Sequence, residues 1–195
     1  RTAAPARDAM SLRPSDLLDF QQQLPRIELD IHITGRLVDL GEEGIEIALR
    51  VGELEDSSLI ARLLMPCGFH ACASPEYLKK HGKPKHPDEL ETHNCMIYSQ
   101  APHPDSWQFK GDRGKSIRIK VHGNLRSDTG NILMDAALND NGIFIGPTFM
   151  IASALEEGRL ETILDDYTPV TTGLYAVYPY SKLVSTKVRA FVDHI

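Results

Sequence analysis

The sequence predicts an α/β fold with two subdomains, because two kinds of pattern alternate along its 195 residues. Segments with apolar residues at every second position are typical of strands, and they alternate with segments of helical spacing. Such alternation favours an α/β architecture with largely parallel sheets. Strands dominate the middle of the chain, which suggests that a second subdomain is inserted between the early and late parts of the first.

The first third of the chain contains a clear strand pattern and a clear helix end. Residues 27–33 alternate Ile and Leu with Glu, Asp and His, which is the pattern of a strand with one buried face. Gly44 follows a short segment of helical spacing and is a common residue just past a helix. The predicted elements are a helix over 8–23, a strand over 27–33, a short helix over 37–43, and strands over 45–51 and 59–64.

The middle of the chain begins with a strand over 69–73 and a well-marked helix. Ser74 can cap that helix and Pro75 suits its first position, while Gly82 follows its last residue. A second helix is predicted over 87–92. Strands are predicted over 95–99, 107–110, 117–121 and 124–127.

The last part of the chain returns to helical spacing. The apolar residues 132, 133 and 136–138 predict a helix that Asp128 or Thr129 caps. The remaining predicted elements are a strand over 143–145, a helix over 149–157 that ends at Gly158, a strand over 174–178 and a helix over 185–194.

Composition excludes several classes of protein. The formal net charge of −6, without a basic domain, argues against nucleic-acid binding by this chain. There is no apolar run long enough for a membrane helix, so no membrane partner is expected. Arg1 is not a natural start, so we expect a fragment or a processed product with further domains elsewhere. The odd count of three cysteines predicts buried free thiols in a cytoplasmic protein rather than a disulfide framework.

The sequence shows no catalytic or metal-binding pattern. It lacks a GxSxG nucleophile elbow. Cys67, His70 and Cys72 are closely spaced, but alternation along a strand places Cys67 on the opposite face from the other two. We therefore expect no metal, no cofactor and no enzymatic activity.

Three helix starts follow predicted strands and can attract a polar or anionic ligand through their free N–H groups. They lie at 4–11, 127–130 and 146–149. The alternative is that Asp8, Asp128 and Thr148 only cap helices, each by about 1 kcal/mol. Arg50, at the end of a strand, can clamp a carboxylate or can equally brace nearby acidic residues.

Several short motifs occur in order along essentially the whole chain, and together they carry a specific resemblance. They are VDL at 38–40, EGIEIALRVG at 43–52, DSSLIAR at 56–62, ASPEYL at 73–78 with Gly82 and Pro84, DEL at 88–90, HNC at 93–95, AA at 136–137, NGI at 141–143, AVYP at 176–179 and KVRAFVD at 187–193. Each motif is weak alone. In register, they make the chain resemble the effector-binding domain of LysR-type transcriptional regulators.

The resemblance implies a type 2 periplasmic-binding-protein fold. Two α/β subdomains would be joined by two crossing strands, near residues 63–69 and 172–176, with a cleft between them. Subdomain I would comprise residues 1–66 and 176–195, and subdomain II residues 67–175.

The resemblance also implies that the domain binds a small effector, for which the helix starts favour an anion, and that it forms a homodimer or homotetramer. DNA would be contacted only through an N-terminal winged helix-turn-helix that this sequence lacks. The implied ligand contacts are Arg7, Asp8, Ala9, Met10, Thr34, Gly35, Arg36, Arg50, Val51, Gly52, Ser57, Ser127, Asp128, Thr129, Thr148 and Phe149.

One departure and one alternative accompany the resemblance. Arg7 and Asp8 stand where the family commonly has small hydroxylated residues, which indicates an unusual effector or none. A periplasmic solute-binding protein of a transporter would share the fold. The absence of a visible signal peptide, the unpaired cysteines and the 56–59 motif weigh against that alternative.

Overall fold

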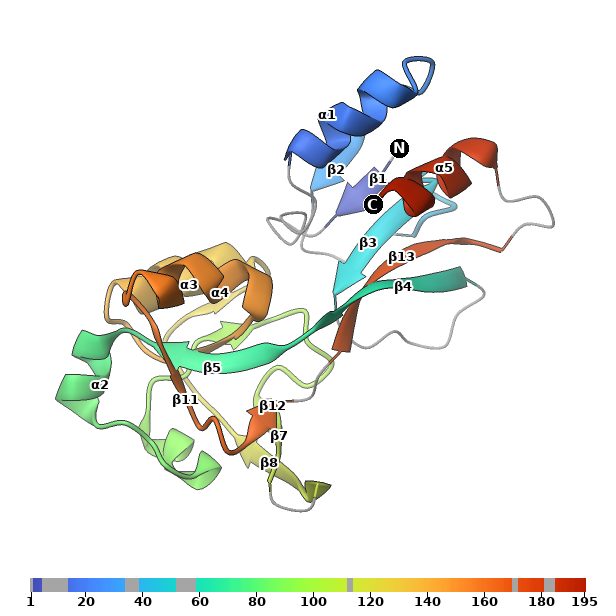
Figure 1. Ribbon diagram of the computed structural model, residues 1–195. Coiled ribbons are helices and arrows are strands. Elements are labelled where there is room, and N and C mark those ends of the chain that lie inside the picture. Colours follow the sequence, from blue (N-terminus) through green and yellow to red (C-terminus); the bar gives the residue numbers. More distant parts are fainter. Residues whose placement is uncertain are drawn as a thin grey trace. The chain divides into compact units, whose positions relative to one another are not determined.

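The computed structural model describes residues 2–4, 14–33, 39–51, 59–111, 114–169, 172–180 and 185–195. The chain forms two compact units (Figure 1). Unit 1 comprises residues 1–66 and 172–195, and unit 2 comprises residues 67–171. The return to unit 1 therefore lies before β13 (Thr172–Pro179), and the boundary expected at 175–176 falls inside that strand. Because β13 pairs continuously with a strand of unit 1 over 174–177, the whole strand belongs to that sheet.

Unit 1 is a five-stranded sheet with two helices packed on it. The strands occur in the order β2-β1-β3-β13-β4, where β1 is Thr2–Ala4, β2 is Ile31–Ile33, β3 is Ile47–Val51 and β4 is Leu59–Cys67. Strand β1 runs parallel to β2 and β3, whereas β13 is antiparallel to β3.

The helices of unit 1 are α1 (Pro14–Gln23) and α5 (Thr186–His194), and they lie side by side. Phe20 of α1 meets Phe191 of α5 edge to face at 5.2 Å between ring centroids. These rings pack with Leu49, Leu174 and other apolar residues on one face of the sheet. Ser185 caps α5 by accepting a hydrogen bond from the backbone N–H of Val188 at 3.3 Å.

Two predictions for unit 1 are wrong. Residues 39–44 form a turn rather than the end of a helix, because the Asp39 side chain accepts from the backbone N–H groups of Gly41 and Glu42 at 2.8 and 3.0 Å. The strand predicted over 27–33 begins only at Ile31. Ile27 instead closes a turn by donating its N–H to the Leu24 carbonyl at 2.9 Å. The start of the helix predicted over 8–23 lies outside the described residues.

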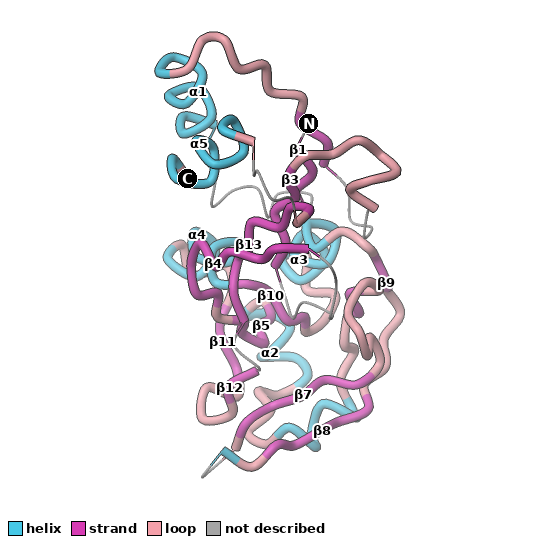
Figure 2. Tube along the Cα trace, turned by 90° about the vertical axis from the view of Figure 1, so that its right-hand side faces the viewer, coloured by secondary structure: helices cyan, strands magenta, loops and turns pink. Residues whose placement is uncertain are grey.

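Unit 2 is built around β5 (Phe69–Ala73), which pairs antiparallel with β10 (Phe144–Pro147) and β11 (Glu161–Ile163). Helices α3 (Gly130–Leu138) and α4 (Thr148–Glu156) lie side by side on one side of β5 (Figure 1). A second antiparallel sheet joins β7 (Ser106–Lys110), β8 (Ser116–Lys120) and β12 (Thr168–Pro169), as Figure 2 shows. Strands β6 (Ile97–Tyr98) and β9 (Arg126–Ser127) form a short parallel pair.

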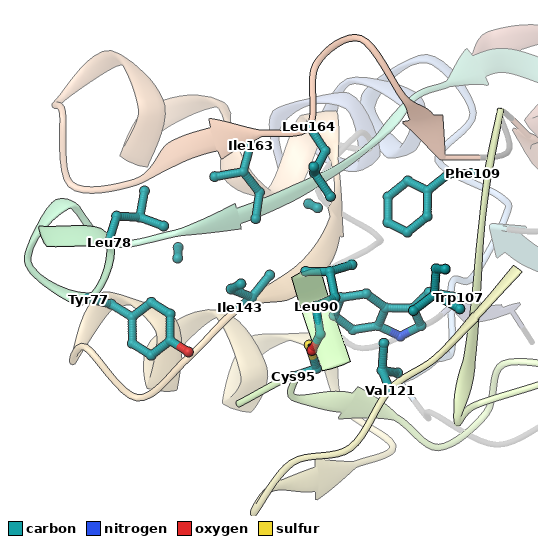
Figure 3. Packing of buried hydrophobic residues seen from close by; sticks show 13 residues of the cluster. Tyr77, Leu78, Leu90, Cys95, Trp107, Phe109, Val121, Ile143, Ile163 and Leu164 are labelled. Carbon is teal, nitrogen blue, oxygen red and sulfur yellow. The ribbon is translucent and has the colours of Figure 1, made fainter. Parts of the chain in front are cut away.

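The core of unit 2 has two parts on opposite faces of β5. Ala71 and Ala73 face a cluster with Trp107 and Phe109 (Figure 3), whereas Cys72 packs with residues of α3 and α4. The predicted helices over 75–81 and 87–92 are confirmed as α2 (Pro75–His81) and a 3₁₀ helix, η2 (Pro87–Thr92). Ser74 accepts from the backbone N–H of Tyr77 at 3.2 Å, which is the predicted cap.

The prediction of largely parallel sheets is wrong for unit 2, where the two larger sheets are antiparallel in every described pairing. Side-chain alternation marks a strand but carries no information about its direction. Strands β11 and β12, three and two residues long, were not predicted. No helix in the described part of the chain combines the length and apolarity that a membrane crossing requires.

Candidate functional site

The predicted contact residues separate into three groups. Those at 7–10, 34–36, 52 and 57 lie outside the described residues. Arg50 and Val51 belong to unit 1, on β3. Ser127, Asp128, Thr129, Thr148 and Phe149 belong to unit 2, where they occupy the starts of α3 and α4. The geometry of the site is therefore built from unit 2.

The start of α3 follows β9 through a short polar turn. Two hydrogen bonds to Ser127 hold this turn. The Ser127 carbonyl accepts from Ser99 N–H at 2.8 Å, and the Ser127 hydroxyl accepts from Thr129 N–H at 3.0 Å. Thr129 is the N-cap residue, as one of the two predicted candidates. Its hydroxyl, however, donates to the Asp128 carboxylate at 3.2 Å and makes no hydrogen bond to the first turn of the helix.

The start of α4 follows β10 directly. Pro147 is its N-cap residue and offers no side-chain acceptor. Thr148, the first helical residue, donates both its N–H and its hydroxyl to the carbonyl of Gly68, at 2.9 and 3.1 Å. The Thr148 hydroxyl therefore ties α4 to the segment between β4 and β5 instead of capping the helix. Beyond Thr148, the N–H groups of the first turn of α4 have no side-chain cap.

The Met150 side chain of α4 reaches the start of α3. A Cβ atom placed on Gly130, at the start of α3, would lie 2.8 Å from Cε and 3.4 Å from Sδ of Met150 in the first turn of α4. The end of the Met150 side chain thus occupies the space that a side chain at position 130 would need. The structure brings Ser127–Thr129 and Thr148–Phe149 into one region of unit 2. That these residues contact a ligand stays a prediction.

His70 is a further polar residue of this region, and it is not among the predicted ligand contacts. It lies half-buried on β5, opposite Gly146 of β10. A Cβ atom on Gly68 would lie 3.6 Å from His70 Nε2 and 3.0 Å from the Thr148 hydroxyl oxygen. The imidazole therefore stands beside the start of α4. Side-chain alternation along β5 places Gly68, His70 and Cys72 on the side that carries α4. This alternation was the feature of the sequence from which the position of His70 could have been predicted.

The electrostatics differ between the two helix starts. Uncapped N–H groups give a helix start a positive partial charge, and neither α3 nor α4 has an acidic residue in its first turn. The exposed Asp128 carboxylate precedes α3 and offsets part of that charge. No corresponding carboxylate precedes α4, because the residues before it are Gly146 and Pro147. The start of α4 is thus the more favourable place for an anion.

One buried acceptor lies close to the same region in the chain. Asn131, the second residue of α3, has its side-chain oxygen buried without a hydrogen-bond partner among the described residues. Leaving a buried polar atom unpaired costs about 1–3 kcal/mol. A donor supplied at this helix start would remove that cost.

The two predicted contacts in unit 1 differ in character. Val51 packs against the apolar cluster of unit 1, so its side chain contributes to the core. Arg50 lies opposite Tyr175 of β13, and partial burial lowers the pKa of its guanidinium. Ligand contact by these two residues stays a prediction.

Nothing in the described residues forms a metal centre, since no group of three or more His, Cys, Asp or Glu side chains is arranged to hold an ion. The three cysteines are buried and form no disulfide among the described residues. Burial raises the pKa of Cys95 to about 12 and raises that of Cys72 further, so both remain neutral thiols near pH 7. Neutral buried thiols are poor nucleophiles.

Comparison with known proteins gives consistent matches over nearly the full chain. A model of the LysR substrate binding domain matches residues 9–195. The chain is 33% identical over 177 residues to the HTH-type transcriptional regulator CrgA of Neisseria meningitidis serogroup B, covering 90% of this chain and 58% of CrgA. The chain spans about three fifths of the length of the curated relatives it matches, at 60% and 58% for two of them.

Solved structures show the same similarity. The regulatory domain of CrgA from Neisseria meningitidis matches with a TM-score of 0.82 at 31% identity, covering 98% of this chain and 94% of that one. The full-length Vibrio cholerae virulence activator AphB, a member of the LTTR family, matches with a TM-score of 0.83 at 27% identity. That match covers 100% of this chain and 66% of AphB.

Proposed function

Because the chain belongs to the family of LysR substrate-binding domains, which has a type 2 periplasmic-binding-protein-like α/β fold, we propose that it is the ligand-sensing domain of a LysR-type transcription regulator. In this proposal it binds a small effector and catalyses no reaction. The curated relatives, which include CrgA, are named as transcriptional regulators, and this favours regulation over solute transport.

The paired helix starts of unit 2 carry the proposal. Ser127, Thr129 and Thr148 bring hydroxyl groups to two adjacent first turns that lack side-chain caps. A polar effector would accept hydrogen bonds from these free N–H groups, and its apolar part would lie against Phe149 and Met150, which are both half-buried. The location in a cleft between subdomains, which the resemblance implied, stays a prediction.

We expect the effector to carry a negative charge, placed at the start of α4. A helix N-terminus stabilises a nearby anion by typically about 0.3–1 kcal/mol at an exposed site. The α3 start gains less because Asp128 already supplies a negative charge there. His70 beside Thr148 would add a hydrogen-bond donor in its protonated state or in one neutral tautomer.

Thr148 offers a route from binding to conformational change. Its hydroxyl now donates to the carbonyl of Gly68, and Gly68 follows the point where the chain passes from unit 1 to unit 2, between residues 66 and 67. An effector that accepts the same hydroxyl proton would compete with that carbonyl. An effector shifts a conformational equilibrium only if its affinity differs between the two states. This exchange of hydrogen-bond partners would provide that difference in affinity.

The partners of the complete protein follow from the same family. We expect DNA to be contacted by a winged helix-turn-helix in another part of the regulator, and the complete protein to be a homodimer or homotetramer. The solved structures include full-length AphB, a member of the LTTR family, and CrgA, a LysR-type transcriptional regulator.

A thermal-shift screen with small carboxylates and phosphate esters tests the proposal. We expect at least one compound class to raise the melting temperature, and Thr148→Val to remove most of that shift. The matched control is Thr92→Val on η2, because the Thr92 hydroxyl likewise donates one hydrogen bond to a backbone carbonyl, that of Glu89 at 2.9 Å. Stabilisation that survives Thr148→Val, or that Thr92→Val removes equally, would show that the effector binds elsewhere.

A further inference from the structure

The outer face of the hairpin formed by β7 and β8 is cationic. Side chains alternate between two faces along both strands, and Trp107 and Phe109 point into the core of unit 2 (Figure 3). The opposite face carries Lys110, Arg118 and Lys120, all of them exposed. The buried face fixes the orientation of the cationic face, because a shift of one residue would bring the cations into the core.

Strand register places these cations in a row. Arg118 lies opposite Gln108, Lys110 opposite Ser116, and Lys120 opposite Ser106. Neighbours two residues apart on one strand stand about 7 Å from each other, and diagonal neighbours about 7–8 Å. The three cations therefore follow one another in steps of about 7–8 Å, with neutral polar side chains between them. Gln108 donates to the Ser116 hydroxyl at 2.8 Å, which shows that these two side chains share the face.

The cations on this face have no carboxylate partners among the described residues. Within the part of the chain that the structure describes, no ion pair engages Lys110, Arg118 or Lys120. The acidic residue just before β7 is Asp105, and it is already paired with Arg126. On a chain with a net charge of −6, this face is a local exception that attracts anions.

The composition of the face favours one class of polyanion. Protein interfaces depend on buried aromatic, Met and Arg anchors and are depleted of Lys. None of the large apolar side chains that are exposed in the described part of the chain belongs to β7 or β8. Lys, Arg, Ser and Gln are instead the side chains that commonly contact phosphate and sugar in protein–DNA complexes.

We propose that the outer face of β7 and β8 contacts the phosphate backbone of duplex DNA, without reading its sequence. The acidic balance of the chain predicted no nucleic-acid binding. We expect DNA contact at this face alone, where the local charge is positive. It rests on the proposed function only for the choice of DNA as the polyanion, since the contact requires no effector.

The salt dependence of binding gives the expected magnitude. Each phosphate that a cation neutralises on B-DNA contributes about −0.9 to the slope of log K against log salt concentration. Three contacts predict that affinity falls about 40-fold between about 50 and 200 mM salt. With Arg118→Gln and Lys120→Gln, one contact remains and the fall becomes about 3.5-fold.

Fluorescence anisotropy with a short labelled DNA duplex of mixed sequence tests the proposal on the 195-residue chain. The control is Lys80→Gln with Lys85→Gln. Both lysines are exposed and lie off the face, and the two substitutions remove the same charge as R118Q/K120Q. We expect the control to bind DNA as the unsubstituted chain does, and R118Q/K120Q to lose affinity and salt dependence together.

Three results would overturn the proposal. They are the absence of DNA binding at about 50 mM salt, an equal loss in both double variants, and equally tight, face-dependent binding of polyglutamate. The last result would identify an acidic protein as the partner. Because R118Q/K120Q leaves Thr148 unchanged, the thermal-shift assay separates a failure of this face from a failure of the effector site.

Discussion

Asn94 should be one of the most sensitive side chains of unit 2, because it joins the two segments that lead into the candidate site. Its side-chain oxygen accepts from Asn124 N–H at 2.9 Å, and its amide nitrogen donates to the Asn124 side-chain oxygen at 3.0 Å and to the Asn141 carbonyl. The Asn124 segment continues into β9 and the start of α3. The Asn141 segment continues into β10 and the start of α4.

The magnitude follows from the three hydrogen bonds that Asn94→Ala removes. Each contributes a net of about 0.5–1.5 kcal/mol, so the free energy of unfolding of unit 2 should fall by about 2–4 kcal/mol. The matched control is Asn139→Ala, where the amide makes one hydrogen bond, to the Asp135 carbonyl at 2.7 Å, and the expected loss is about 1 kcal/mol.

Urea denaturation followed by tryptophan fluorescence measures this loss. Trp107 is the only tryptophan of the chain and is buried in the core of unit 2, so its emission reports on that unit. A loss for Asn94→Ala no greater than that for Asn139→Ala would refute the reasoning. It would mean that the segments before β9 and β10 are held by their backbone hydrogen bonds alone.

Two further predictions concern acid stability and backbone packing in unit 2. Burial lowers the pKa of His93, whose ring nitrogen Nδ1 shares a hydrogen bond with the Tyr77 hydroxyl at 3.1 Å, so the unfolded state binds a proton on this ring more tightly than the folded state does. Stability should therefore fall as pH drops below about 6.5, and a urea-midpoint series should show a weaker fall for His93→Gln. Gly123→Ala should destabilise unit 2 severely, because its Cβ would lie 2.0 Å from the Cys95 carbonyl oxygen. Normal urea unfolding of that variant would contradict the close approach.

Local signals in the sequence predicted the boundaries of α2 and α5 and the end of α4. Ser74 and Ser185 cap α2 and α5 through side-chain hydrogen bonds, and Gly82 and Gly158 adopt positive φ angles of 89° and 67° just past α2 and α4. These interactions involve residues three or four positions apart, so the residue types alone carry the information.

Features that depend on distant segments were not predictable in the same way. Strand direction is set by which strands meet, and the period of two is the same for parallel and antiparallel pairs. Residues 39–44 have helical spacing, but the Asp39 carboxylate captures two backbone N–H groups and holds a turn instead. That competition between side chain and backbone has no periodic signature.

The candidate site likewise has features that the local sequence predicted and features that depend on distant residues. The sequence identified the helix starts at Ser127–Thr129 and Thr148–Phe149, because each combines a strand end with polar residues. It did not show that the Met150 side chain reaches Gly130, or that the Thr148 hydroxyl is bonded to Gly68. These two contacts join residues that are 20 and 80 positions apart in the sequence.

The most direct test of the central claim is an NMR titration of the ¹⁵N-labelled chain with the compound that stabilises it most. We expect the largest amide shifts at Thr129, Thr148 and Phe149, with a further shift at Gly68 as the Thr148 hydroxyl exchanges its partner. Shifts concentrated away from the starts of α3 and α4, with Thr148 and Gly68 unchanged, would contradict this expectation.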